Sequence, residues 1–66
     1  MASAGRLARV IEQAIAVFEE VESAVDWLHH RNHALGGVTP ISLLDTEFGA
    51  EEVSKVLGHI AHGIPY

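Results

Sequence analysis

Residues 32–40, with the sequence NHALGGVTP, constrain the fold of this chain more than any other feature. Gly36 and Gly37 supply the positive φ angles that a chain often needs when it leaves a helix. Thr39 suits the N-cap position of a new helix, and Pro40 suits its first position. The segment therefore predicts a tight turn, flanked by Asn32 and Leu35, that fixes how two helices cross.

Apolar residues before this turn recur at helical spacing. One stripe is formed by Leu7, Val10, Ile11, Ala14, Val17, Phe18 and Val21, and it is widened by Ala8 and Ile15. The same phase continues to Leu28, so periodicity alone permits one helix from about Arg6 to His30. Residues 1–5 are expected to be frayed.

We favour a break in this pattern near Glu19–Ser23, because one long helix would leave few elements to close a core. Ser23 and Asp26 resemble a capping box, which would start a second helix there. That helix is expected to end near His30–His33.

A short helix with Ile41, Leu43 and Leu44 is predicted after the turn, followed by a connector over Asp45–Gly49. The last helix is expected to hold Glu51 and Glu52 in its first turn, where the helix dipole favours carboxylates. Its apolar positions are Ala50, Val53, Leu57 and Ile60. Gly63 should end this helix and leave an extended tail, since a residue before proline avoids the helical region.

The predicted fold is all-α, a small bundle of three longer helices and one short helix with an extended C-terminal tail. At 66 residues the chain is expected to form a single domain, and almost half of it is hydrophobic. It has no cysteine, which excludes disulfides and thiolate metal sites. Neither a transmembrane pattern nor a signal peptide is visible, so a cytoplasmic location is expected.

The charge pattern indicates a protein partner. The formal net charge is −5, with only four lysines and arginines, and nucleic-acid binding needs several such cations on one face. We therefore expect no nucleic-acid binding by this chain alone and no membrane binding. An acidic surface is complementary to a basic protein.

Five histidines raise the question of a metal site. His29 and His33 lie four residues apart, and His59 and His62 three apart, but no zinc motif is matched. Histidines near helix C-termini commonly interact with the helix dipole, which is the interpretation we favour. The sequence also lacks a phosphate-binding loop and a nucleophile elbow, so neither an enzyme nor a cofactor is expected.

Trp27 and the tail each allow two interpretations. Trp27 is expected to anchor the core, although tryptophan is also enriched in interfaces. The segment Ile64-Pro65-Tyr66 is either a frayed end or a docking element, because an apolar tail stiffened by proline loses little entropy on binding.

Taken together, these residues resemble the toxin-binding domain of Xre/MbcA/ParS-type antitoxins. The resemblance rests on Val17-Phe18, Ala24, Trp27-Leu28, Asn32, Leu35, Gly36, Gly37, Pro40, Leu43-Leu44, Thr46, Gly49, Val53, Leu57, Ile60 and Gly63. It implies an antitoxin of a bacterial type II toxin–antitoxin system. Such antitoxins usually pair with RES-domain toxins, which consume NAD⁺, and a higher-order toxin–antitoxin complex is possible.

The resemblance also implies which residues meet the toxin. Ile64, Pro65 and Tyr66 would block the active-site cleft, while His59, Ile60, His62 and Gly63 would line the contact. Full-length relatives typically carry a helix-turn-helix domain that binds operator DNA, and no such domain is expected in this sequence. The alternative is an oligomerisation or scaffold module from a DNA-binding transcriptional regulator, supported by the wide apolar surface of the first helix.

Overall fold

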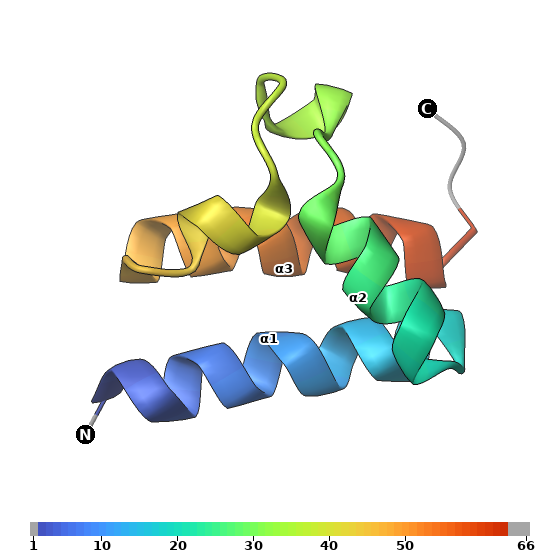
Figure 1. The fold of residues 1–66 in the computed structure, drawn as a ribbon, viewed down its shortest axis with the longest axis horizontal. Helices are drawn as coiled ribbons and strands as arrows, with labels where there is room; N and C mark the ends of the chain where they lie inside the picture. The colour runs from blue at the N-terminus through green and yellow to red at the C-terminus, as the bar shows by residue number, and fades with distance from the viewer. Residues whose placement is uncertain (1, 64–66) are drawn as a thin grey trace.

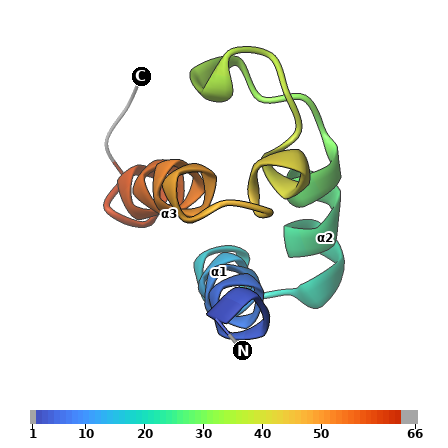
Figure 2. The ribbon, with the colours of Figure 1, turned by 90° about the vertical axis from the view of Figure 1, so that its left-hand side faces the viewer.

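The computed structural model describes residues 2–63, with side chains from residue 5 onward. This range forms three α-helices and two 3₁₀ helices, in the order α1 (Ala2–Phe18), α2 (Val21–His29), η1 (His33–Leu35), η2 (Pro40–Leu43) and α3 (Glu47–Ala61). Helices α1 and α3 lie side by side and run in the same direction, while α2 leads from the end of α1 to a projecting turn (Figure 1, Figure 2). The predicted all-α bundle is confirmed.

The start of α1 was predicted too late. The helix begins at Ala2, within the five residues expected to be frayed. Alanine has the highest helix propensity, and extending an existing helix by one residue costs far less than starting a new one. The helix therefore extends back over the alanine-rich start of the chain.

The break between α1 and α2 is confirmed, but its chemistry differs from the prediction. Glu19 has a φ of 64°, and Glu20 is extended and occupies the N-cap position of α2. The Ser23 hydroxyl donates a hydrogen bond to the Glu20 carboxylate over 3.1 Å. The predicted capping box of Ser23 and Asp26 is therefore wrong, because the left-handed Glu19 reverses the chain early and α2 starts at Val21.

The turn after α2 follows its predicted local chemistry. Gly36 and Gly37 have φ angles of 80° and 86°. Asn32 closes the turn: its side chain accepts a hydrogen bond from Ala34 N–H at 2.9 Å, and its N–H donates to the Val38 carbonyl at 2.9 Å. The closed turn includes η1, a 3₁₀ helix that the sequence analysis did not predict.

The short helix η2 also starts where it was predicted. Thr39 occupies its N-cap position without a side-chain capping bond, and the buried Pro40 takes the first helical position. The connector predicted over Asp45–Gly49 is too long, because α3 already begins at Glu47. Glu47 therefore occupies the first turn of α3, where Glu51 and Glu52 had been expected.

Two contacts explain the early start of α3. The Thr46 hydroxyl oxygen accepts a hydrogen bond from Gly49 N–H at 3.0 Å and so caps the helix. Gly49 then faces the backbone of Leu43, and a Cβ atom at this position would overlap the Leu43 carbonyl. A glycine that resembles a helix breaker in the sequence is thus required by close packing inside the first turn.

The core contains residues from all three α-helices. Its buried apolar side chains are Val10, Ala14, Ala24, Leu28, Leu44, Ala50, Val53 and Leu57. Trp27 is only half-buried, and its ring lies 5.8 Å from that of Phe18 at the margin of the core. Leu7 and Val21, which were predicted on the apolar stripe, are 40% and 59% exposed.

The end of α3 agrees with the prediction. Gly63 has a φ of 69°, and its N–H donates to the Ile60 carbonyl at 3.0 Å. The predicted extended tail, Ile64–Tyr66, lies outside the described residues. Within residues 2–63, none of the helices combines the length and the apolar composition needed to cross a membrane.

Candidate functional site

The outer face of α3 carries His59 and His62, two of the residues predicted to bind a partner. Positions 48, 52, 55, 59 and 62 follow one another at steps of four and three, so their side chains share one face of the helix. We call this set, formed by Phe48, Glu52, Lys55, His59 and His62, the outer stripe. The buried residues Ala50, Val53 and Leu57 occupy the opposite face, so the outer stripe is directed toward solvent.

The structure brings the described part of the predicted contact together at the C-terminal end of α3. His59, His62 and Gly63 are exposed, and Ile60 is 36% exposed beside them. The three remaining residues of the predicted contact, Ile64, Pro65 and Tyr66, lie outside the described residues. The end of α3 is therefore accessible to a partner at the point where the chain enters this last segment.

The five residues highlighted in the predicted turn, together with Trp27, have architectural roles. Asn32, Gly36, Gly37 and Pro40 shape the turn and start η2. Leu35 and Trp27 are half-buried and pack against the core. These residues hold the turn in place, and none of them lies on the outer stripe.

The histidines do not form a metal site within the described part of the chain. No group of three or more potential metal-binding side chains is found among these residues. The His29 Nδ1 atom lies 2.8 Å from the Val25 carbonyl, and the His30 Nδ1 atom lies 2.7 Å from the Asp26 carbonyl. His29 ends α2 and His33 begins η1, so the spacing of four residues does not place these two histidines on one helix face.

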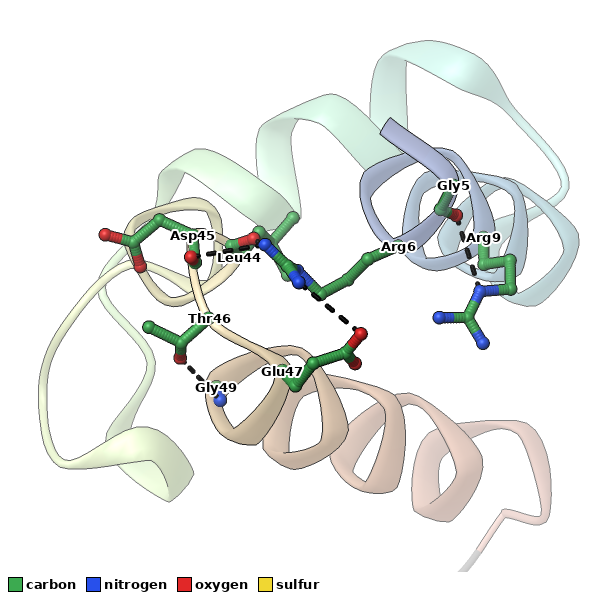
Figure 3. Close-up of polar contacts among 8 residues, drawn as sticks. All are labelled: Gly5, Arg6, Arg9, Leu44, Asp45, Thr46, Glu47 and Gly49. Atoms are coloured by element: carbon green, nitrogen blue, oxygen red, sulfur yellow. Dashed lines mark hydrogen bonds and ion pairs between the residues drawn. The ribbon is translucent and has the colours of Figure 1, made fainter. Parts of the chain in front are cut away.

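Arg6 is an important residue that the sequence analysis missed. It is only 8% exposed, and its guanidinium donates hydrogen bonds to the carbonyls of Leu44 and Asp45, both at 3.2 Å (Figure 3). It also lies 3.4 Å from the Glu47 carboxylate. Arg6 thus ties α1 to the start of α3, and its position four residues before Val10 on the apolar stripe was the available signal.

A second polar pair joins the middle of the same two helices. The Gln13 amide donates to the Ser54 carbonyl at 3.1 Å, and the Ser54 hydroxyl donates to the Gln13 amide oxygen at 2.7 Å. Beside this pair, an open groove of about 250 Å³ runs between α1 and α3, and Arg9, Glu47 and Glu51 line it together with the pair. The groove borders the outer stripe at its Phe48 end.

Another exposed patch lies at the corner between α1 and α2. Val21 is 59% exposed there, and Glu20 and Glu22 flank it. This corner combines an apolar side chain with carboxylates, as the Phe48 end of α3 does, but lies on a different helix. It offers a natural control for experiments on the outer stripe.

Comparison with known proteins identifies the domain. A family model described as the antitoxin Xre/MbcA/ParS C-terminal toxin-binding domain matches residues 13–63. A protein named Antitoxin Xre from Photorhabdus laumondii is 42% identical over 60 residues, which cover 89% of this chain and 40% of that protein. An Antitoxin Xre from Yersinia enterocolitica is 37% identical, again over 89% of this chain and 40% of the relative.

A third relative has a more specific name. The Prs ADP-ribosylating antitoxin of a Sphingobium species is 39% identical over 61 residues, covering 89% of this chain and 38% of that protein. The chain thus spans about 40% of the length of the curated relatives that it matches. The family model covers most of the chain and includes the turn, the core and α3, and this chain therefore belongs to the family of Xre/MbcA/ParS antitoxins, within which residues 13–63 correspond to the C-terminal toxin-binding domain.

Proposed function

We propose that this chain neutralises a RES-type, NAD⁺-consuming toxin in the cytoplasm by occupying its active-site cleft. Ile64, Pro65 and Tyr66 are the blocking element, and the C-terminal end of α3 lines the contact. The observation that carries the proposal is the match of residues 13–63 to a toxin-binding domain, which ends immediately before this segment.

The charge of the chain supports this target. Nine acidic residues against four lysines and arginines give the chain a net charge of −5. Enzymes that act on nucleotides commonly present cations to the phosphates of their substrates, and such a cleft attracts an acidic protein. The name of the Sphingobium relative refers to ADP-ribosylation, a reaction in which NAD⁺ donates the ADP-ribose group.

The composition of the last residues supports a blocking role for them. Pro65 has a restricted φ, which lowers the conformational entropy that the segment loses on binding. Tyr66 adds an aromatic ring to this segment. An aromatic ring is complementary to a pocket that is built for an aromatic base.

An NAD⁺-depletion assay tests the proposed function. The toxin encoded in the same operon is incubated with NAD⁺ and increasing amounts of this chain. We expect NAD⁺ loss to stop at about a stoichiometric amount of the chain, as for a tight inhibitor. Undiminished NAD⁺ loss at a large excess of the chain would contradict the proposal.

The blocking element is tested by deleting residues 64–66. We expect a loss of inhibition that is much larger than any change in the thermal unfolding midpoint, because α3 ends before this segment. If the shortened chain still inhibits fully, the helical body itself blocks the toxin and the role assigned to the tail is wrong.

One observation favours the alternative of an oligomerisation or scaffold module. Leu7 is 40% exposed and Ala8 is also exposed on α1, which leaves apolar surface on that helix. Sedimentation velocity separates the two functions. A tight dimer that is indifferent to the toxin would favour the scaffold, whereas a monomer that forms a complex with the toxin would favour inhibition.

A further inference from the structure

Phe48 is the most exposed of the large apolar side chains in the described part of the chain, with 74% of its surface accessible. Single exposed apolar residues are common and need no explanation by themselves. Phe48 differs because it stands on the outer stripe, which is otherwise made of charged residues and histidines. An aromatic ring in this position leaves a large apolar area in water that a partner would bury.

The backbone that carries Phe48 is held firmly on both sides. Its neighbour Glu47 pairs with the buried Arg6 at 3.4 Å, and the next residue, Gly49, packs against the backbone of Leu43. The Thr46 cap completes this first turn, as Figure 3 shows for the contacts around it. A side chain on such a rigid turn loses little backbone entropy on binding, which is a property of interface anchors.

Carboxylates lie close to Phe48 in the sequence. Asp45 and Glu51 are exposed, and neither forms an ion pair with another described residue at the distances found for Arg6–Glu47 and Lys55–Glu52. Glu51 also lines the groove that separates α3 from α1. An aromatic side chain within an acidic rim is complementary to an apolar pocket bordered by lysine or arginine.

A second copy of this chain does not offer that complement. Its net charge is −5, so that two copies repel, and two of its four lysines and arginines, Arg6 and Lys55, already pair with carboxylates of the same chain. The outer stripe instead connects Phe48 with His59 and His62, about 17 to 21 Å along α3 at the usual helical rise. A single basic partner can therefore contact Phe48 and the C-terminal end of α3 at the same time.

We propose that Phe48 is a second anchor for the toxin, inserted into an apolar pocket whose basic border meets Asp45 and Glu51. This inference rests on the proposed function, and it assigns a different role to each end of α3. The C-terminal end blocks the active site, and the Phe48 end contributes affinity without contacting the cleft.

Binding of full-chain variants to the purified operon-encoded toxin, measured by calorimetry, tests the proposal. Phe48→Ala should raise the Kd at least about tenfold, as expected for an aromatic anchor, with an unchanged thermal midpoint. Glu51→Gln should weaken binding and reduce its dependence on salt. The matched controls Val21→Ala and Glu22→Gln, at the α1–α2 corner, should change the Kd less than about twofold.

Inhibition distinguishes an anchor from a blocking residue. At saturating concentration, Phe48→Ala should still stop NAD⁺ loss completely, because the C-terminal segment remains in place. Wild-type affinity for Phe48→Ala, or equal losses in Phe48→Ala and Val21→Ala, would overturn the inference and leave the proposed function intact. Conversion of a dimer into a monomer by Phe48→Ala would assign this surface to self-association instead. If the unaltered chain does not bind the toxin, the proposed function and this inference both fail.

Discussion

The two ends of α3 differ in how firmly they are connected to the rest of the molecule. At its start, a buried arginine, a threonine cap and a glycine packed on backbone join the helix to α1 and η2. At its end, His62 and Gly63 are exposed, and the helix stops in a glycine turn. The contacts of Arg6, Thr46 and Gly49 are thus concentrated at the start of α3, whereas the residues after the buried Leu57 are left accessible to a partner.

This difference matters for a small antitoxin domain. A chain of this size has few buried residues, so each contact at the start of α3 contributes a large share of its stability. If the residues that contact a partner also formed the core, each substitution among them would lower the stability of the whole domain. Because the proposed contact residues lie at the other end of the helix from these stabilising contacts, we expect them to tolerate substitution without loss of the fold.

Substitution of the two glycines within α3 tests this contrast most strongly. Gly49→Ala should lower the free energy of unfolding by about 3 kcal/mol, because its Cβ atom would overlap the Leu43 carbonyl. Gly58→Ala is the control, since a Cβ there meets nothing within 4 Å. Because alanine favours the helix, Gly58→Ala should raise stability by up to about 1 kcal/mol. Urea denaturation measures the free energy of unfolding of both variants. Equal changes in the two variants would show that the two ends of α3 are packed alike.

Removal of the buried guanidinium should have the next largest effect. Arg6→Ala should cost about 2 kcal/mol, because the carbonyls of Leu44 and Asp45 lose their hydrogen-bond donors. Arg9→Ala is the matched control on the same helix. The Arg9 side chain is exposed and, among the described residues, donates a hydrogen bond only to the nearby Gly5 carbonyl. Arg9→Ala should change the free energy of unfolding, measured by thermal unfolding, by no more than about 0.5 kcal/mol. A comparable loss of unfolding free energy in both variants would show that the buried contacts of Arg6 do not stabilise the fold more than an exposed arginine does.

The two threonines at helix starts sharpen the comparison further. Thr46→Ala should cost about 1 kcal/mol, because the Gly49 N–H loses its capping acceptor. Thr39→Ala should cost less, because the Thr39 side chain makes no capping bond at η2. Hydrogen exchange of the Gly49 amide gives a local measure of the same cap. If the Gly49 amide is as well protected from exchange in Thr46→Ala as in the wild type, the Thr46 side chain does not cap the helix.

The smallest effect on stability is expected at the far end. His62→Ala removes an exposed side chain and should shift the free energy of unfolding by less than about 0.5 kcal/mol. The same substitution should weaken binding to the operon-encoded toxin, if the end of α3 lines the contact as proposed. Calorimetry of binding and of unfolding on one sample separates the two effects. A large loss of stability in His62→Ala would show that His62 stabilises the fold and would argue against its role in the toxin contact.

Much of the fold was predictable because it depends on neighbouring residues. The left-handed glycines at 36, 37 and 63 and the proline at the start of η2 follow from backbone sterics within a few residues. The break after α1 was placed correctly, although the position of the α2 start was not. For the proposed contact, the family resemblance indicated the end of α3, which is exposed, but nothing in the sequence indicated Phe48.

What the sequence determined by itself was the three α-helices and η2, the turn between α2 and η2, and the family of the domain, because helical periodicity and turn chemistry are local. Only the tertiary structure decided that Arg6 is buried, that Gly49 is indispensable and that Phe48 faces solvent. The Arg6 contact with the Leu44 carbonyl joins residues 38 positions apart, so no local pattern reveals it. The exposure of Phe48 likewise depends on which face of α3 packs against α1 and η2, and that choice is made by the assembled core.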